Sequence, residues 1–340
     1  MPLSISNSDP TERAALHRVP RYARAAGITI LLLALFIVGL EAVTRIGFNR
    51  ISRIESRTAK EHLDARDMRP VAKPNVLLLG NSLLLEGLDY QRIQKDLSGE
   101  IGVTRFVIEG TLYYDWYYGI RRLLADGSRP TLIVLCLSPL QLIQNNIPND
   151  YLAYYLFQAG DIPELSRVTH AGLTKASSLM LARYSLFYAG RNNLRNFILN
   201  HTYAPYGEFL HGIRTTAGKF PPSEAFQGVI QQRLRALNEE CARYHVQFAF
   251  LIPPAVSVEG EAETLQAGRQ AGAPVLRPIP GGVFTPDLFN DGFHLNARGA
   301  AAFTSALEQS LEQYLKIQTG NASRGNGELI GLESLRTREP

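Results

Sequence analysis

Short apolar runs alternate along most of this chain with longer stretches in which apolar residues recur at helical spacing. Three of the short runs are almost continuously apolar, as expected for strands covered on both faces of a parallel sheet. This alternation predicts a three-layer α/β/α sandwich with a mostly parallel, five-stranded sheet, and such sheets hold ligands at the carboxyl ends of their strands. We predict strands at 76–79, 105–108, 132–137, 246–252 and 275–279, and helices at 90–97, 113–124, 226–244, 264–271 and 297–315.

The alternation is interrupted at about 139–222, where Tyr, Phe and Leu recur at helical spacing. This segment is too apolar for a disordered loop and too long for a simple connection. We predict a helical insertion that caps the strand ends and shapes the entrance to a site there.

A run without charged side chains lies near the N-terminus, at residues 25–40. Extended past Glu41 to residue 46, it approaches the roughly 20 residues that cross the apolar core of a bilayer. The run is apolar on all faces, unlike most helices of a soluble core, and no small-x-small site closes it as in the alternative, a cleaved signal peptide. We predict a transmembrane helix at 25–46. A first apolar segment with a basic N-terminal flank inserts N-terminus inward, so residues 1–24 would be cytoplasmic and the rest periplasmic or extracellular.

The other regions follow from charge and composition. Residues 47–73 are densely charged with mixed sign, which predicts a solvated stalk or linker, and residues 318–340 are rich in Gly, Asn, Ser and charge, which predicts disorder. The net charge of +4 is small and the basic residues do not gather along one domain, so nucleic-acid binding is not expected. Cys136 and Cys241 lie in apolar surroundings and are predicted to be buried thiols, with a disulfide as the alternative.

Two short polar motifs supply candidate chemistry. Ser82 follows the strand at 76–79 and precedes a helix, whose free N–H groups and positive dipole end stabilise an oxyanion. Asp291 and His294 lie just before the last predicted helix. Each motif alone is also common as a turn with a helix cap. Together they provide the nucleophile, base and carboxylate of acyl transfer.

These motifs resemble those of the SGNH/GDSL hydrolase superfamily: Leu-Leu-Gly-Asn-Ser, and Asp-x-x-His leading into a helix. The resemblance covers residues 75–315 apart from the insertion, and implies a flavodoxin-like hydrolase domain at 74–317. It implies that Ser82 is the nucleophile, His294 the general base, and Asp291 the carboxylate that orients the imidazole. It also implies an oxyanion hole made by the backbone N–H groups of Ser82 and Gly110.

The chain departs from the family pattern in two places. Asn81 replaces the usual Asp before the serine, a change expected to disturb local hydrogen bonding more than proton transfer. The family's Gly-x-Asn-Asp block, whose Asn donates to the oxyanion, is replaced after the third strand by Leu-Ser-Pro-Leu. Asn145 or Asn146 is the candidate third donor. Loss of such a donor costs on the order of 3 kcal/mol in the barrier.

The Ser-Pro pair and the N-terminal apolar helix are similar to those of membrane-anchored SGNH-like proteins that help D-alanylate teichoic acids or O-acetylate exported polysaccharides such as alginate. This similarity implies a membrane-tethered serine esterase or O-acyltransferase. It would act on acyl groups, acetyl above all, of a cell-surface carbohydrate or polymer, together with a membrane-bound acyl-transfer partner. The alternative is a catalytically inactive polymer-binding or scaffold protein in an export or modification complex, which the missing Asn block and the aromatic insertion favour. No cofactor or metal is expected, since the sequence has no His-x-x-x-His pair and no nucleotide-binding motif.

Overall fold

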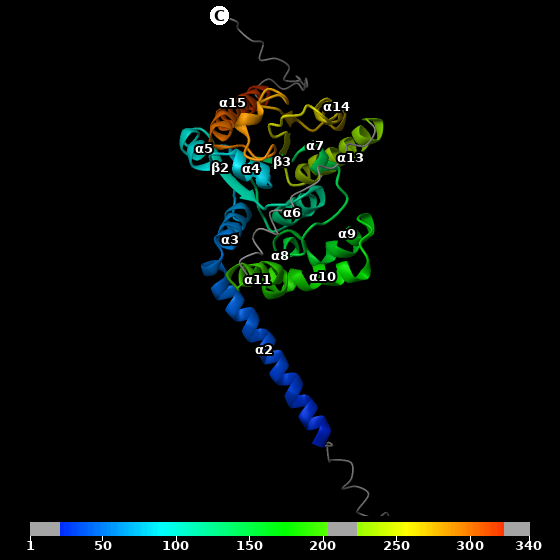
Figure 1. Cartoon of the computed structure of the whole chain (residues 1–340). Coiled ribbons are helices and arrows are strands. Elements are labelled where there is room, and N and C mark those ends of the chain that lie inside the picture. The colour runs from blue at the N-terminus through cyan, green and yellow to red at the C-terminus, as the bar shows by residue number, and fades with distance from the viewer. Residues whose placement is uncertain (1–20, 203–222, 323–340) are drawn as a thin grey trace, which may run out of the picture.

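A parallel five-stranded sheet in the order β2-β1-β3-β4-β5 forms the centre of the molecule (Figure 1). The computed structural model describes residues 21–202 and 223–322. All strand pairs of this sheet are parallel, which confirms the prediction of a parallel sheet. The strands are β1 (Asn75–Gly80), β2 (Gly102–Val107), β3 (Leu132–Cys136), β4 (Gln247–Leu251) and β5 (Val275–Leu276).

Two strands differ from their predicted bounds by more than one residue at an end. β2 begins at Gly102 rather than at 105, because its first half lies at the sheet edge, where alternate side chains are partly exposed and no continuous apolar run marks the strand. β5 ends after two residues, at Leu276, instead of continuing to 279.

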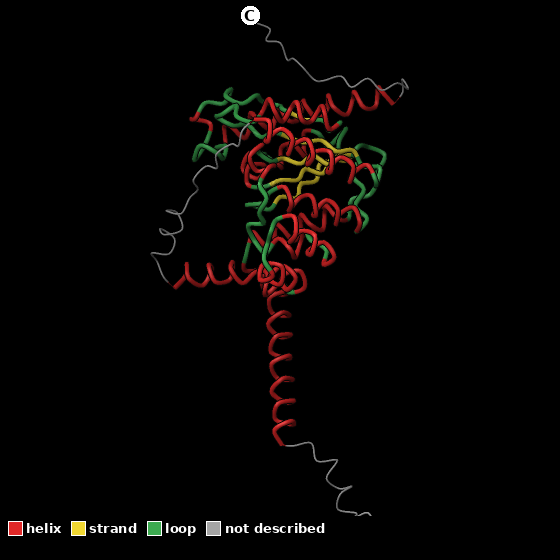
Figure 2. Tube along the Cα trace, turned by 90° about the vertical axis from the view of Figure 1, so that its right-hand side faces the viewer, coloured by secondary structure: helices red, strands yellow, loops and turns green. Residues whose placement is uncertain are grey.

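Helices cover both faces of the sheet and make the three predicted layers (Figure 2). Alternate side chains of β1 enter different cores: Leu77 and Leu79 join one cluster, whereas Val76 and Leu78 join the other. The first cluster is closed by α3 (Arg53–Arg66), α6 (Tyr113–Ala125), α13 (Ser223–Ala242) and α14 (Glu261–Ala271). The second is closed by α4 (Ser82–Gly87), α5 (Tyr90–Asp96) and α15 (Ala297–Ala322).

The insertion at 139–222 forms mainly helices over its described residues, and 203–222 lie outside them. α8 packs against α6, and α11 packs against α2, whereas α7 follows β3 directly. Most of the insertion therefore lies between the α6 layer and α2 rather than over the strand ends, which corrects part of the expectation (Figure 1). Its elements are α7 (Pro139–Ile143), α8 (Leu152–Leu156), the 3₁₀ turn η2 (Ala159–Asp161), α9 (Ile162–Val168), α10 (Leu173–Tyr184) and α11 (Leu186–Thr202).

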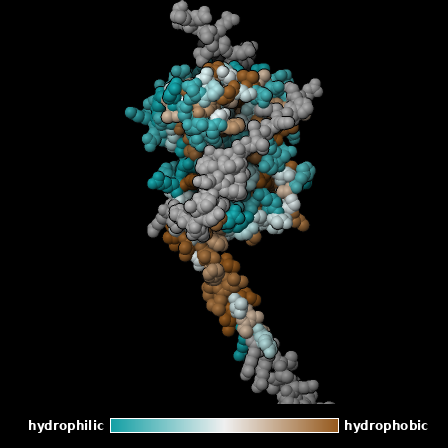
Figure 3. Space-filling view, viewed as in Figure 1, coloured by the Kyte–Doolittle hydropathy of each residue, from teal (hydrophilic) through white to brown (hydrophobic). Residues whose placement is uncertain are grey.

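The N-terminal apolar run forms α2 (Arg21–Ile51), which projects from the domain (Figure 3). Within its stretch Tyr22–Gly47, the most apolar 18-residue window has a mean hydropathy of 2.5 and is not buried by the rest of the described chain, so the helix is long and apolar enough to cross a membrane. Glu41 interrupts this stretch for a structural reason. Its carboxylate accepts hydrogen bonds from the backbone N–H groups of Leu186 (2.9 Å) and Phe187 (3.1 Å), and thus caps the N-terminus of α11. The cap joins α2 to the domain.

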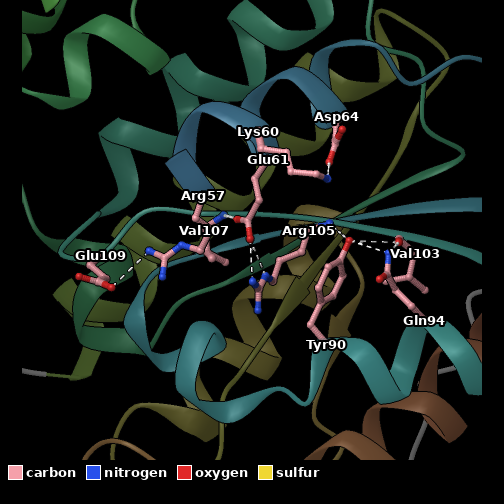
Figure 4. Close-up of polar contacts among 10 residues, drawn as sticks. All are labelled: Arg57, Lys60, Glu61, Asp64, Tyr90, Gln94, Val103, Arg105, Val107 and Glu109. Atoms are coloured by element: carbon pink, nitrogen blue, oxygen red, sulfur yellow. Dashed lines mark hydrogen bonds and ion pairs between the residues drawn. The ribbon is translucent and has the colours of Figure 1, made fainter. Parts of the chain in front are cut away.

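The predicted stalk at 47–73 is in part a packed helix, which corrects the expectation of a solvated linker. α3 buries one face, with Glu55, Thr58, Glu61, His62 and Ala65 at its centre. The sequence did not reveal this face because two of its buried residues are glutamates, whose carboxylates find partners within the domain, as Figure 4 shows for Glu61.

Glu61 fastens α3 to the edge strand of the sheet (Figure 4). Its carboxylate accepts hydrogen bonds from the Arg105 guanidinium (2.6 and 3.0 Å) and from the backbone N–H of Val107 (2.9 Å). The Arg105 guanidinium also lies 4.4 Å from the centre of the Tyr90 ring. A backbone donor at the open edge of β2 is thereby satisfied within the domain.

The remaining expectations concern the C-terminus and the thiols. α15 continues to Ala322, so residues 318–322 of the predicted tail are helical, and the rest lies outside the described residues, as do residues 1–20. Cys136 and Cys241 are free and buried, as predicted.

Candidate active site

The fold brings Ser82, near the start of the domain sequence, together with Asp291 and His294, near its end. The Ser82 Oγ lies 2.9 Å from the His294 Nε2, and the His294 Nδ1 lies 2.8 Å from the Asp291 Oδ2. With the proton on Nδ1 donated to Asp291, Nε2 accepts a hydrogen bond from the Ser82 hydroxyl. Ser82 and His294 are half-buried and Asp291 is exposed, so the group is open to solvent on one side. The arrangement is able to remove the proton of the serine hydroxyl.

Ser82 is positioned by a sharp turn from β1 into α4. A Cβ on Gly80 would lie 2.8 Å from the carbonyl oxygen of Cys136 in β3, which leaves room only for glycine there. The turn places Ser82 at the first position of α4, where backbone N–H groups have no partner within the helix.

Asp291 and His294 are held by a short loop between the 3₁₀ turn η3 (Pro286–Leu288) and α15. An isolated antiparallel bridge between Phe289 and Leu295 closes this loop. Within it, the Asp291 Oδ1 accepts hydrogen bonds from the backbone N–H groups of Phe293 (3.1 Å) and His294 (2.9 Å). The carboxylate therefore fixes both the loop and the imidazole.

The same hydrogen bonds keep Asp291 ionised. Partial burial alone would raise the pKa of Asp291, but the hydrogen bonds from the His294 ring and from the N–H groups of His294 and Phe293 lower this pKa to about 2. Asp291 thus remains a carboxylate at any pH at which the serine would be used, and favours the imidazolium formed when His294 takes a proton.

Asn81 uses both halves of its buried amide. Its Oδ1 accepts a hydrogen bond from the backbone N–H of Leu83 (3.1 Å), and its Nδ2 donates to the carbonyl oxygen of Thr111 (3.0 Å). An aspartate at this position would cap α4 but has no hydrogen to donate to Thr111. The amide of Asn81, which stands where the family pattern has Asp, is therefore suited to this position because it can both accept from Leu83 and donate to Thr111.

The Asn81–Thr111 bond also fastens the loop that contains Gly110 to the end of β1. The backbone N–H of Ile108 donates to the Gly80 carbonyl oxygen (3.1 Å), and the Trp116 indole N–H donates to the Thr111 hydroxyl (2.8 Å). Gly110 is exposed, with a φ of +71° that favours glycine. Sequence reasoning did not identify Thr111, which accepts from Asn81, or Trp116, which donates to Thr111. Both lie within six residues of Gly110, and that closeness in sequence could have pointed to them.

The candidate third donors have other surroundings. The side-chain oxygen of Asn145 accepts a hydrogen bond from the Arg233 guanidinium, which also donates to the carbonyl oxygens of Leu142 and Gln144. Asn146 is exposed. Over the described residues, neither asparagine is hydrogen-bonded to Ser82, His294 or Asp291. Arg233 thus ties the segment after α7 to α13. The hydrogen bonds described for Asn145 give it a place in this contact and none at the Ser82 hydroxyl.

Within residues 21–202 and 223–322, no three His, Cys, Asp or Glu side chains lie close enough together to hold a metal ion.

No protein family model and no curated protein matches the chain. Among solved structures, the chain is similar to a psychrotrophic esterase from Pseudoalteromonas sp., with 14% identity, a TM-score of 0.38, and coverage of 72% of this chain and 100% of that one. It is also similar to an α/β hydrolase from the metagenome of Lake Arreo (10% identity, TM-score 0.38, coverage 72% and 97%). A third is a variant of an acetyl-xylooligosaccharide esterase from Geobacillus (10% identity, TM-score 0.35, coverage 70% and 94%). Values this low assign no activity to this chain.

Proposed function

We propose that this chain is a membrane-tethered serine ester hydrolase or O-acyltransferase of the SGNH type. The observation that carries the proposal is the pair of hydrogen bonds that joins Ser82 to His294 and His294 to Asp291, at 2.9 and 2.8 Å. A turn with only a structural role would not require hydrogen bonds that link Ser82 to residues more than 200 positions later in the sequence.

In the first half-reaction, the Ser82 Oγ attacks the carbonyl carbon of an ester while the His294 Nε2 takes the hydroxyl proton. The negative charge that develops on the carbonyl oxygen would be met by the backbone N–H groups of Ser82 and Gly110. His294 then returns the proton to the leaving alkoxide, and the acyl group remains on Ser82.

In the second half-reaction, an incoming hydroxyl attacks the acyl carbon, His294 takes its proton, and the Ser82 oxygen leaves and recovers that proton. Water as the incoming group makes the protein an esterase, and a sugar hydroxyl makes it an O-acyltransferase. We propose an acetylated cell-surface carbohydrate or polymer as the substrate class, the periplasm or cell exterior as the location, and a membrane-bound acyl-transfer protein as a partner. The helix α2 supports the tether.

Asn145 is held at Arg233 and, among the described residues, has no hydrogen bond to Ser82, His294 or Asp291, which favours a second candidate, a polymer-binding or scaffold protein without catalysis. Without a third donor the oxyanion would be held by two N–H groups, at a cost on the order of 3 kcal/mol in the barrier. This cost slows an esterase but does not abolish it.

Labelling of the full chain in detergent by a fluorophosphonate probe tests the proposal. We expect labelling of the wild type and none in Ser82→Ala or His294→Ala. Ser138→Ala is the matched control, because Ser138 also follows a strand and caps a helix, α7, while its hydroxyl accepts only from the backbone N–H of Gln141 among the hydrogen bonds described for it. Labelling that persists in Ser82→Ala, or a folded wild type that is never labelled, would support the scaffold candidate.

A further inference from the structure

A cavity of about 470 Å³ lies where the domain meets α2, and it is separate from Ser82. The residues that line it come from α2, α3, α6, α8, α10 and α11. These helices lie on the side of the domain toward α2 (Figure 1). Among the described residues that line the cavity are four arginines and one histidine, and none is a carboxylate: the basic residues are Arg45, His62, Arg66, Arg122 and Arg183.

Carboxylates just outside the walls balance three of the four arginines. These pairs are Arg45 with Glu41 at 2.7 Å, Arg66 with Asp67 at 2.9 Å and Arg122 with Asp126 at 3.6 Å. Arg183 has no carboxylate within ion-pair distance in the described part of the chain, and its buried Nε makes no hydrogen bond there. Within the described residues, one cationic charge in the cavity therefore has no counter-ion.

His62 reports the same excess of positive charge. Its side chain is buried, with 9% of its surface exposed, and its Nε2 makes no hydrogen bond within the described ranges. Burial, and then the nearby guanidinium groups of Arg122 and Arg66, lower the pKa of His62 to about 4. A neutral imidazole and an unbalanced guanidinium thus share a recess in which none of the described lining residues is anionic.

The position of the cavity matches the level of lipid headgroups. Arg45 lies near the C-terminal end of the apolar stretch Tyr22–Gly47, where a spanning helix leaves the hydrocarbon core. Beside the cavity, α10 exposes Leu181 (54%) and Tyr184 (64%). Tyrosine and arginine are residues typical of a membrane interface.

We propose that this cavity binds the phosphate group of an anionic membrane lipid, in the leaflet from which α2 emerges. Guanidinium groups present paired N–H donors that match phosphate oxygens, and a phosphate supplies the counter-ion that Arg183 lacks. The proposal rests on the membrane span and is independent of the chemistry at Ser82. Bound lipid would fix the angle between α2 and the domain, because the walls of the cavity belong to both.

Native mass spectrometry of the full chain in a neutral detergent tests this, with phosphatidylglycerol and phosphatidylcholine offered at equal concentrations. We expect the wild type and Ser82→Ala to retain phosphatidylglycerol at least tenfold better than phosphatidylcholine. Arg183→Gln should lower this retention at least tenfold. Arg66→Gln, whose side chain is 40% exposed at the rim, should do the same and decides the matter if Arg183→Gln does not fold.

Arg167→Gln is the matched control, because it removes an equal charge from an exposed site on α9, outside the cavity. It should change retention less than twofold. Equal losses in all three arginine variants would mean diffuse surface charge, and equal retention of the two lipids would mean no selection for an anion. Either result overturns the proposal.

Inorganic phosphate separates a lipid site from a site for a soluble anion. We expect it to raise the pKa of His62 in a histidine-selective NMR titration, because it neutralises the nearby guanidinium charge, and to displace phosphatidylglycerol only in large excess. Displacement at equal concentration would assign the cavity to a soluble phosphate compound and overturn the lipid assignment. Loss of fluorophosphonate labelling would leave all these outcomes unchanged, so failures of the two proposals are distinguishable.

Discussion

Replacement of His62 by Phe is expected to make the protein less sensitive to acid. The pKa of His62 is about 4 in the folded state against an ordinary value of 6.5. Between these values the unfolded chain binds more protons than the folded one, so stability falls as the pH falls through this window. The full difference is worth about 3 kcal/mol at 1.36 kcal/mol per pH unit, and we expect about 2.5 kcal/mol of it to be lost between pH 7 and pH 4.5.

Phe is suited to the site because the His62 ring already packs edge-on against Phe106 at 5.5 Å and Tyr155 at 5.4 Å. The assay is urea unfolding of the full chain in detergent micelles at both pH values, for the wild type and His62→Phe. Contributions from other titrating groups are common to both proteins and cancel in the difference. If the two proteins lose the same free energy of unfolding between pH 7 and pH 4.5, His62 is not held neutral by burial and its arginine neighbours.

Three further substitutions probe the site and its support. Asp291→Asn should lower the rate of fluorophosphonate labelling about 10³–10⁴-fold, because an amide stabilises the wrong tautomer of His294; a loss below tenfold would contradict the role of the carboxylate. Asn81→Asp should lower the free energy of unfolding by about 1–3 kcal/mol, because a buried carboxylate would face the carbonyl oxygen of Thr111; an unchanged thermal midpoint would show that this bond carries no stability. Glu41→Ala should speed hydrogen exchange at the first amides of α11, which lose their cap, by about fivefold to thirtyfold, and exchange at the centre of β1 serves as the internal control.

The parallel sheet was predictable from sequence because buried strands carry their signal locally. The run at 76–79 is apolar on both faces of the sheet, and both faces are indeed covered. The turn residues Gly80 and Ser82 follow that run directly, so their place at the end of β1 needed no knowledge of distant segments. The pairing of Ser82 with His294 was reached only by combining two motifs, and the structure brings their side chains to 2.9 Å.

Other features depend on contacts between segments far apart in the chain, and no local pattern shows them. α3 is as charged as a solvated stalk, yet Glu61 is buried because Arg105 and the edge of β2 supply its partners. Glu41 is likewise an anomaly in an apolar run until α11 is placed against it. In both cases an acidic residue accepts a hydrogen bond from at least one backbone N–H of a distant element, and a sequence pattern does not reveal which element that is.

The arrangement of α2 and the site bears on which acyl acceptor the proposed enzyme would use. Figure 1 places α15, which begins three residues after His294, at the end of the domain opposite α2, with the helices of the insertion between. If α2 crosses the membrane, Ser82 and His294 are held away from the bilayer by the thickness of those layers. An acyl group carried within the membrane would have to pass these layers to reach Ser82, whereas one on a polymer in the aqueous compartment would not. Transfer from a membrane-bound donor would therefore require a partner protein that delivers the acyl group across this gap, whereas hydrolysis of a soluble acetylated polymer would require none. Activity of the isolated full chain on an acetylated polysaccharide, measured as released acetate, would favour hydrolysis; acyl transfer that appears only with a membrane fraction would favour the delivery model.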